Sequence, residues 1–359
     1  MLTLLGVGSA GQGLPTLTSL SPVNGATGVS TTTNLVLTFD QDMTPQSGAD
    51  NNIDIYSTAA GVAAQFTHGN SEKLTYSPGS HADWAFDDSG WWMACWVYLD
   101  NLTNGHGIAG RYSYASGSGG MAIHVDATNG RVVVSFANHP SYNQPSFTGL
   151  SAGQWYHLFV WHDPTANTAN LMVDGVLKTS NSYTAGLAVA TSVDFNVGYH
   201  NQTGNYGSHR IDAVVVGKTP TSITSLASTI SAALYNSGNG KSISSLTAQQ
   251  KSDWGVLHGY DLEETSGTRA DAIGSHDLTD NNTVTSATGK TAVTTLVESI
   301  DAQDAKVTGG GTSTITINPA ATLDSAKDHY VLIGADALDG PGGSWGGITS
   351  STTWAFTTA

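Results

Sequence analysis

The sequence predicts an all-β protein made of two sandwiches. Only 11% of its 359 residues are charged, and the 28 acidic residues comprise 24 Asp and four Glu. Few Glu and Lys, together with many Thr, Ser, Asn and Gly, disfavour helices and favour strands joined by turns. Short runs in which apolar and polar residues alternate recur along the chain, as expected of strands with one buried face. A chain of this length is sufficient for two domains.

The N-terminal end predicts the first strands of a sandwich. Residues 1–14 are rich in glycine, and we expect them to form an anchoring arm. Residues 35–39 alternate between apolar positions and intervening Val and Thr, which indicates a strand with one buried face. Residues 53–56 repeat this pattern.

The C-terminal end continues the same pattern. Residues 296–300, 314–317 and 329–333 each predict a strand, and the last strand places Trp354 and Phe356 on one face. None of these strands has an obvious partner within its own end of the chain. The strands of the two ends are therefore expected to pair with each other.

Chain length supports one sandwich built from both ends. Residues 15–57 and 292–359 together make 111 residues, close to the ~100 of an immunoglobulin-type sandwich. Insertions are tolerated where an exposed loop tip has its ends close together, so we expect residues 58–291 to be inserted at a hairpin tip. Three sequential domains are the alternative, which leaves unpaired strand edges at both ends.

The insert predicts a second, larger β sandwich. Residues 91–99 are apolar on both faces, which is typical of a central strand, and residues 155–161 form another strand. Turns are predicted at residues 129–130 and 174–175, because Asn-Gly and Asp-Gly steps favour tight hairpins.

Two short helices are predicted near the end of the insert. The first is expected to be capped by Thr219, with Pro220 in its first position and apolar residues at every third or fourth position up to Leu234. The second is expected to begin after Thr247, which forms a capping box with Gln250.

These segments carry two family resemblances. Residues 21–29, with the sequence SPVNGATGV, and residues 353–358 resemble the opening and closing strands of a bacterial immunoglobulin-like (Ig-like) domain of surface and phage proteins. Residues 96–99, 153–157 and 173–175 resemble a concanavalin A-like jelly roll of the laminin-G type. The implied fold is an Ig-like sandwich interrupted by a jelly roll, a fold that serves lectins, glycan hydrolases and structural modules alike.

Charge and composition exclude several classes of partner. The net charge of −16 repels phosphate backbones, so nucleic acid is not expected as a partner. A membrane is not expected either, because basic clusters and apolar runs of about 20 residues are both missing from the sequence. The single cysteine, Cys95, lies in an apolar strand and is interpreted as a core thiol.

The sequence does not predict an enzyme. Jelly-roll glucanases resembled here carry alternating Glu and Asp on one strand, and no such run occurs. Glu263 and Glu264 are adjacent, so on a strand they point to opposite faces and are interpreted as solvated charges. His162 and Asp163 precede a proline, which favours a turn cap over a catalytic pair.

No cofactor is expected. Domains of the laminin-G type often hold calcium at a rim, and Asp126, Asp174 and Asp212 are candidates by residue type. Each has a simpler interpretation as a turn or edge residue, and no calcium-loop spacing is present. The 12 histidines show no pair at helical ligand spacing, so no zinc site is predicted.

Five tyrosines are candidates for contacting a ligand. Sugars stack on exposed aromatic rings beside polar donors and acceptors, and loops on a rigid sandwich are where binding usually occurs. The alternative is that these rings pack over the edges of the sandwich or against a neighbouring subunit. The candidates, all in segments rich in Gly, Ser or Asn, are Tyr112, Tyr114, Tyr142, Tyr199 and Tyr206.

The resemblances imply a structural protein of a bacteriophage virion. The expected role is capsid decoration or a head or tail appendage, docked through the arm and the Ig-like domain and displaying the jelly roll. The expected partners are other virion proteins of the capsid or tail, further copies of the chain, and cell-surface glycans. A secreted or surface carbohydrate-binding adhesin is the alternative, and a glycan hydrolase is disfavoured.

Overall fold

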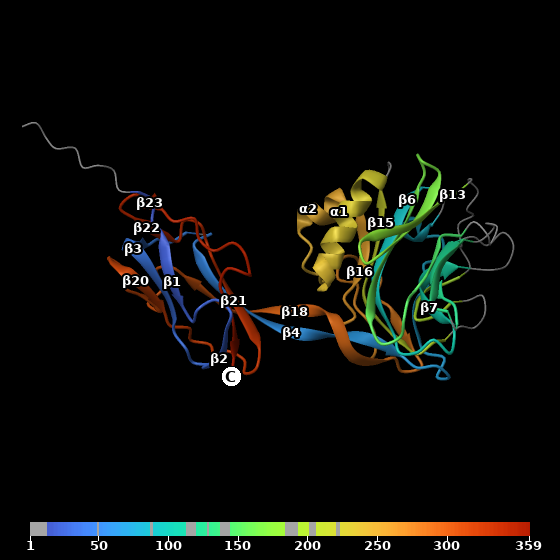
Figure 1. Ribbon diagram of the computed structural model, residues 1–359, viewed down its shortest axis with the longest axis horizontal. Coiled ribbons are helices and arrows are strands. Elements are labelled where there is room, and N and C mark those ends of the chain that lie inside the picture. Colours follow the sequence, from blue (N-terminus) through green and yellow to red (C-terminus); the bar gives the residue numbers. More distant parts are fainter. Residues whose placement is uncertain are drawn as a thin grey trace, which may run out of the picture. The chain divides into compact units, whose positions relative to one another are not determined.

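The chain folds into two units. The computed structural model describes residues 13–48, 50–86, 89–112, 120–127, 129–136, 144–183, 193–200, 206–219 and 223–359. One unit combines residues 1–59 with 293–359, and the other comprises residues 60–292 (Figure 1). The sequence places these limits at 57/58 and 291/292, within two residues of the observed division.

The first unit, called the Ig-like unit, pairs strands from both chain ends. One sheet has the order β19-β20-β3-β22-β23 with β1 on β3, and the other joins β2, β24, β21 and the first half of β4. The strands are β1 (Leu17–Ser21), β2 (Ala26–Val29), β3 (Leu35–Pro45), β19 (Val307–Thr308), β20 (Thr312–Ile317), β21 (Asp328–Ile333), β22 (Leu338–Gly340), β23 (Gly343–Ser344) and β24 (Ala355–Thr358).

The core of this unit contains residues from both chain ends. Phe39 and Trp354 are fully or almost fully buried and belong to one apolar cluster. The indole nitrogen of Trp354 donates a hydrogen bond to the Pro22 carbonyl at 2.8 Å. The expectation that both ends build one core is therefore confirmed.

Two long strands carry the chain between the units. β4 (Asn52–Phe66) pairs with β21 over its first half, and its residues 64–66 pair with β15 of the second unit. β18 (Thr285–Asp301) pairs with β4. The sequence predicts a short strand ending at residue 56 and a hairpin tip. The strand end at residue 56 was wrong, because pairing with β18 and then with β15 extends β4 to Phe66. The insert does lie between two paired strands, β4 and β18, as an insertion at the tip of a hairpin requires.

The second unit, called the jelly-roll unit, is a sandwich of two sheets. One sheet has the order β10-β9-β8-β7-β14-β5-β17. The other has the order β13-β12-β11-β6-β15, followed by the end of β4, with β16 on β15. The first sheet contains β5 (Lys73–Tyr76), β7 (His106–Tyr112), β8 (Gly120–Val125), β9 (Arg131–Phe136), β10 (Ser146–Thr148), β14 (Phe195–Val197) and β17 (Thr279–Asn281). The second contains β6 (Gly90–Leu99), β11 (Trp155–Asp163), β12 (Thr168–Val173), β13 (Val176–Ser182), β15 (His209–Thr219) and β16 (Val256–Tyr260).

Strand β6 is central, as the sequence predicts. It lies between β11 and β15, and nine of its ten residues are buried. Its residues alternate between the core of the sandwich, where Cys95 lies, and the outer face of the sheet, where Trp96 lies. Burial raises the pKa of the Cys95 thiol to about 12, which keeps it protonated and inert.

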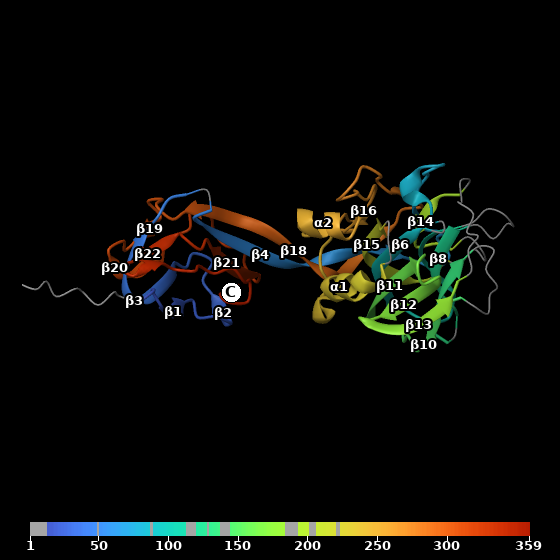
Figure 2. The same cartoon turned by 90° about the horizontal axis from the view of Figure 1, so that it is seen from above.

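Two helices cover the outer face of the sheet that contains β6. These are α1 (Thr224–Tyr235) and α2 (Ala248–Asp253), and both lie on the side of β15 away from β7 and β8 (Figures 1 and 2). Side chains of α1 and of the segment after it pack on outward residues of the sheet, which include Trp92, Trp96, Phe159 and Trp161. Among the described residues, no helix is long and apolar enough to cross a membrane.

The start of α1 differs from its prediction. Thr219 ends β15, residue 220 lies outside the described residues, and the helix begins at Thr224. The reason is tertiary, because Asp163 accepts a hydrogen bond from the Thr224 amide at 3.3 Å. Asp163 also accepts bonds from the amides of residues 165 and 166, so its interpretation as a turn cap is confirmed.

Local turn and cap predictions are confirmed. The hairpins β8–β9 and β12–β13 are closed at the Asn-Gly and Asp-Gly steps, and both glycines have positive φ. The Thr247 hydroxyl accepts from the Gln250 amide at 3.1 Å, and the Gln250 side chain accepts from the Thr247 amide at 3.1 Å. These patterns depend only on neighbouring residues.

Candidate functional site

The seven-stranded sheet of the jelly-roll unit has a polar outer face. On β8 and β9 every second residue enters the core, so the residues between them point outward. The registers of the sheet align one outward residue from each of six strands into a continuous line, which we call the polar row. From β17 to β9 its members are Thr279, Thr75, Asn196, Gly110, Ala122 and Ser135.

Exposure along the polar row rises toward β17. Ser135 is 1% exposed and Asn196 is 7% exposed, whereas Thr279 is an exposed residue. Asn281, two residues further along β17, donates from its amide to the Thr75 hydroxyl at 2.9 Å. The end of the row formed by β5 and β17 is therefore the part that a ligand could reach from solvent.

A short segment after β14 crosses this face. The backbone of residues 198–200 runs directly over β7, where a Cβ on Gly107 would lie only 2.1 Å from the His200 nitrogen. Glycine is therefore required at position 107 for this close approach. At this crossing the His200 ring stacks on the Tyr112 ring, with the ring centroids 5.1 Å apart. It is tilted against the His124 ring, with the centroids 4.5 Å apart.

Polar contacts fix the residues beside the row. The Ser135 hydroxyl lies 3.3 Å from Nδ1 of His124, whose Nε2 lies 3.4 Å from Asp126. Asp126 also pairs with Arg131 at 2.6 Å. The His124 hydrogen bond and the Arg131 charge hold the pKa of Asp126 below its usual value.

Two members of this face keep unsatisfied hydrogen-bonding atoms. Asn196 donates to the Asp194 carbonyl at 2.9 Å, but its Oδ1 is buried without a hydrogen-bond partner among the described residues. Both ring nitrogens of His200 are likewise buried without a hydrogen-bond partner among the described residues. Burial lowers the pKa of His200 to about 3, so the ring is neutral and presents one donor and one acceptor.

Two of the five candidate tyrosines lie together at the exposed end of the face. The rings of Tyr199 and Tyr206 stack at 4.5 Å, and both are partly exposed. Lys73, which lies two residues before Thr75 on β5, places its ammonium 5.1 Å from the centre of the Tyr199 ring. Burial and the neighbouring Tyr199 raise the pKa of Tyr206.

The other three candidates have different positions. Tyr112 ends strand β7 and is 5% exposed, so its interpretation as a loop residue was wrong. The chain crossing at His200 covers its ring, which sequence spacing alone does not reveal. Tyr114 and Tyr142 lie outside the described residues.

Sequence reasoning missed the strand residues of this face. Thr75, His124, Ser135 and Asn196 come from four strands and meet only through the sheet registers. A signal for two of them was present, since His124 and Ser135 are polar residues that alternate with apolar ones in runs otherwise rich in Val and Ile.

A pair of carboxylates occupies a different part of the jelly-roll unit. Asp212 accepts from the amides of Lys290 and Thr291 at 2.6 and 2.9 Å, and Glu263 accepts from the Val62 amide at 2.7 Å. Burial raises the pKa of Asp212 to about 6 and that of Glu263 to about 7. The interpretation of Glu263 as a solvated charge was wrong, because it holds the backbone of β4.

The three calcium candidates are already engaged by protein groups. Asp126 pairs with Arg131, Asp174 accepts from the His157 amide at 2.8 Å, and Asp212 accepts from backbone amides. One other group of metal-ligating side chains converges among the described residues. It comprises Asp83, His258 and His276, whose ligand atoms all lie within 4.8 Å of one another.

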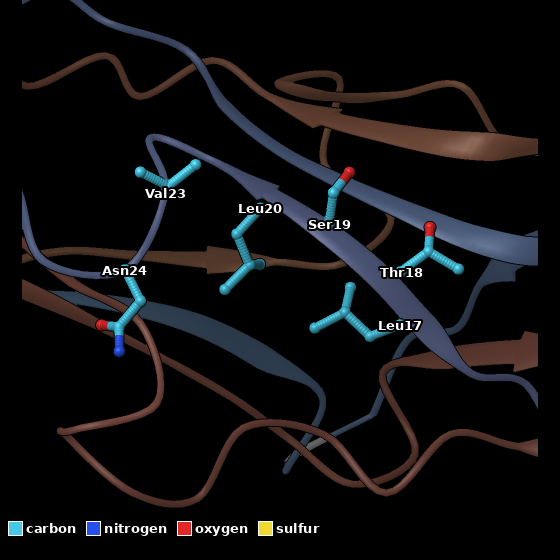
Figure 3. A pocket seen from close by; sticks show the side chains of 6 residues that line it. All are labelled: Leu17, Thr18, Ser19, Leu20, Val23 and Asn24. Carbon is cyan, nitrogen blue, oxygen red and sulfur yellow. The ribbon is translucent and has the colours of Figure 1, made fainter.

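The Ig-like unit carries one hollow of a different kind. It has a volume of about 360 Å³ and lies along β1 and the turn after it (Figure 3). Leu17, Leu20 and Val23 give it an apolar lining, and its polar groups are Thr18, Ser19 and Asn24. Residues 1–12 of the predicted arm lie outside the described residues, and the carbonyl of residue 13, within the arm, accepts a hydrogen bond from the Gln41 side chain at 3.1 Å.

Comparison with protein-family models identifies both domains. The model described as the concanavalin A-like lectin/glucanases superfamily matches residues 68–227, and the model described as a bacterial Ig-like domain matches residues 12–83. The chain contains a bacterial Ig-like domain and a concanavalin A-like domain. The Ig-like match runs past residue 59, where the structure leaves that unit. No match to a curated protein sequence is significant.

Several solved structures resemble part of the chain. A protein from Bacteroides ovatus described as carbohydrate-binding is 14% identical over 64% of this chain and 60% of its own, with a TM-score of 0.45. A SAP-like pentraxin from Limulus polyphemus is 13% identical over 50% of this chain and 84% of its own, with a TM-score of 0.36. The CBM40 domain of a Ruminococcus gnavus IT-sialidase, bound to α2,3 sialyllactose, is 7% identical over 48% of this chain and 97% of its own, with a TM-score of 0.35. Likeness at this level carries no conclusion about the ligand of this chain.

Proposed function

We propose that the jelly-roll unit is a carbohydrate-binding module, carried by the Ig-like unit, and that the chain acts in adhesion to glycans. The observation that carries this proposal is the outer face of the seven-stranded sheet. Its polar row runs across six strands and includes an Asn196 oxygen without a partner among the described residues, and His200 crosses the same face with both ring nitrogens unsatisfied. Buried polar atoms left unsatisfied are uncommon and call for a ligand or ordered water.

The chemistry of this face matches a sugar. A sugar presents hydroxyl groups that both donate and accept hydrogen bonds, together with apolar C–H faces. The amide of Asn196, the neutral ring of His200 and the Thr75 hydroxyl supply donors and acceptors of both kinds. The partly exposed Tyr199–Tyr206 pair supplies an aromatic surface at the accessible end of the row.

The same face favours binding over cleavage. Glycoside hydrolysis usually needs two carboxyl groups on either side of the scissile bond. Among the described residues beside the polar row, Asp126 is already paired with Arg131 and His124. Asp212 and Glu263, whose pKa values burial raises to about 6 and 7, are held by the backbone amides of β18 and β4.

We further propose that the chain is part of a phage virion, which stays a prediction. Its support is the resemblance of both chain ends and of the insert to modules of phage structural proteins. In that setting, the jelly roll would present its polar face to host glycans. Immunogold labelling of purified particles with an antibody to the jelly-roll unit tests it, and unlabelled particles would exclude it.

The binding proposal is tested on a glycan array, followed by calorimetry with the strongest hits. We expect Tyr206→Ala and Asn196→Ala each to weaken binding at least about tenfold, the loss of one good hydrogen bond or stacking contact in a desolvated site. Tyr330→Ala is the matched control, because Tyr330 stacks on Tyr56 at 4.9 Å in the Ig-like unit. Absence of binding to any glycan, or equal losses in all three variants, would contradict the proposal.

A further inference from the structure

A second cluster of polar side chains lies apart from the polar row. Asp83 belongs to the short helix η1 (Ala82–Trp84), His258 to β16, and His276 to the connection between β16 and β17. Their ligand atoms all lie within 4.8 Å of one another, and Nε2 of His258 lies 3.5 Å from the Asp83 carboxylate. Two atoms that each lie about 2.0 Å from a tetrahedral metal are separated by about 3.3 Å. The His258–Asp83 pair thus has almost the spacing of two ligands.

Asp271 determines which nitrogen of the neutral His258 ring carries the proton. Nδ1 of this ring lies 2.7 Å from Asp271, which accepts this hydrogen bond together with bonds from the amides of residues 259, 273, 274 and 276. With four backbone amides as donors, the Asp271 carboxylate is also an acceptor toward the ring. When the ring is neutral, its proton therefore lies on Nδ1, and Nε2 carries the lone pair. A carboxylate behind a histidine is the arrangement that orients metal-ligating imidazoles.

The lone pair of His258 points at the cluster without a hydrogen-bond partner. The side chain is 3% exposed, and Nε2 is one of the buried atoms left unsatisfied among the described residues. Stacking fixes the ring, since Trp84 lies parallel to it at 4.5 Å and His276 lies on it at 4.5 Å. A rigid, buried imidazole whose acceptor faces a carboxylate gains little from this arrangement unless a cation lies between them.

A fourth potential ligand lies on the exposed side. His81, the residue before η1, places Nδ1 3.6 Å from Asp83, and its ring meets that of His276 edge-on at 4.7 Å. The His81 side chain is 48% exposed, so its ring can turn at little cost. His81 is thus a neighbour of two of the three convergent residues, Asp83 and His276.

We propose that His81, Asp83, His258 and His276 form a binding site for a divalent transition metal of the zinc class. Imidazole nitrogen with carboxylate oxygen is a donor set for zinc and its neighbours in the first transition row. Calcium and magnesium prefer six or more oxygen ligands, and one carboxylate does not provide them. The site is separate from the calcium candidates, none of which belongs to this group.

One hydrogen bond has to change when the metal binds. The indole nitrogen of Trp84 donates to Nδ1 of His276 at 3.0 Å, which leaves the proton of the neutral ring on Nε2. Binding of the metal by either nitrogen displaces this hydrogen bond or moves that proton. The surroundings of the Trp84 indole therefore change when the metal binds, because the indole also stacks on His258.

The consequence of occupancy is local order. The metal would join η1 to the segment after β16, two parts of the chain more than 170 residues apart. Asp271 and the carbonyl of Ala82, which accepts from Lys218 at 3.0 Å, already position the two sides. Zinc is then a cross-link at one end of the jelly-roll unit.

The test uses the full chain after treatment with a chelator. Equilibrium dialysis against zinc is expected to load one ion per chain, whereas calcium and magnesium do not compete. Asp83→Asn and His276→Gln should each weaken zinc binding by about tenfold or more, because even partners behind the ligands change affinity by 10–100-fold. A change in tryptophan fluorescence on zinc addition, lost in Trp84→Phe, provides a readout independent of affinity.

A matched control separates this site from general histidine binding. His329 is also a buried histidine with an unpartnered Nε2, but it lies in the Ig-like unit and outside the cluster. His329→Gln should keep one zinc per chain with unchanged affinity. Near-ultraviolet circular dichroism checks that each variant is folded. The proposal is overturned if the wild-type chain takes up no zinc, or if folded Asp83→Asn and His276→Gln bind it as tightly as the wild type.

Discussion

The two outer faces of the jelly-roll unit differ in what covers them and in the kind of side chain that each presents. The face beneath α1 and α2 is apolar and rich in tryptophan. The indole nitrogen of Trp92 donates to the Trp254 carbonyl at 2.9 Å, whereas those of Trp96 and Trp161 have no partner among the described residues. The opposite face carries the polar row, where Asn196 retains an oxygen without a partner among the described residues.

This difference separates stability from function. Burying a large apolar side chain contributes about 1.5–3 kcal/mol to folding, so the helix-covered face stabilises the sandwich. An unsatisfied buried polar atom costs about 1–3 kcal/mol. Such atoms occur on both faces, but the polar row has no large apolar ring among its members to offset the cost. Local choices that oppose folding tend to occur at functional sites.

The largest effect is expected on the helix-covered face. Trp92→Ala removes a fully buried indole and its hydrogen bond to residue 254, and should lower the free energy of unfolding by about 3–5 kcal/mol. Urea unfolding followed by circular dichroism measures this loss. A loss below about 1 kcal/mol would mean that the helices do not pack on this face as described.

Acidification should produce a loss of similar size. Burial lowers the pKa of several histidines, most strongly that of His106, to about 4, and those of His157, His200 and His209, to about 3. Their neutral forms stabilise the fold fully above pH 6.5, and this contribution is lost as the pH falls. Between pH 7 and 5 each histidine costs roughly 2 kcal/mol, at 1.36 kcal/mol per pKa unit.

The carboxylates Asp212 and Glu263 oppose this loss. Their pKa values are raised in the fold, so their contribution is complete at low pH and is lost as the pH rises through about 6 and 7. When the pH falls from 7 to 5, the protonation of these two carboxylates raises the free energy of unfolding by roughly half of the amount that the histidines lower it. The net expectation is a loss of about 4 kcal/mol from pH 7 to pH 5, measured by urea unfolding at both values. Unchanged or higher stability at pH 5 would contradict the neutral, buried state of the histidines.

A single substitution isolates the opposing carboxylate. Asp212→Asn keeps an acceptor for the amides of residues 290 and 291 but removes the ionisation. Relative to the wild type, the variant should gain roughly 3 kcal/mol of stability as the pH rises from 4 to 8, because only the wild type ionises a buried group. Parallel stability curves for the two proteins over this range would show that Asp212 titrates normally.

The sequence could predict what depends on neighbouring residues. The capping box of Thr247, the turn at Asp174 and the central position of β6 follow from chemistry within a few positions. Pairing of the two chain ends was also predictable, because each end was short of partners and their summed length matched one sandwich.

Features that depend on distant residues were not predictable. The start of α1 is set by Asp163, which is 61 residues away, and the engagement of Glu263 is set by Val62, which is 201 residues away. The group formed by Asp83, His258 and His276 could not be predicted for the same reason, since Asp83 and His258 belong to no spacing motif. Tyr112 was placed in a loop because composition does not reveal that the chain at His200 crosses over it.

The smallest effect on stability is expected at Asn196, where the comparison of the two faces is sharpest. Asn196→Ala removes one hydrogen bond to the Asp194 carbonyl, a loss of about 1 kcal/mol, and also removes the cost of the unpartnered oxygen, which is about 1–3 kcal/mol. The gain equals or exceeds the loss, so the free energy of unfolding should stay unchanged or rise by up to about 2 kcal/mol. The same variant should lose glycan binding, whereas Trp92→Ala should lose stability first. A large destabilisation by Asn196→Ala would show that the polar row is part of the scaffold, and the division of roles between the two faces would then be wrong.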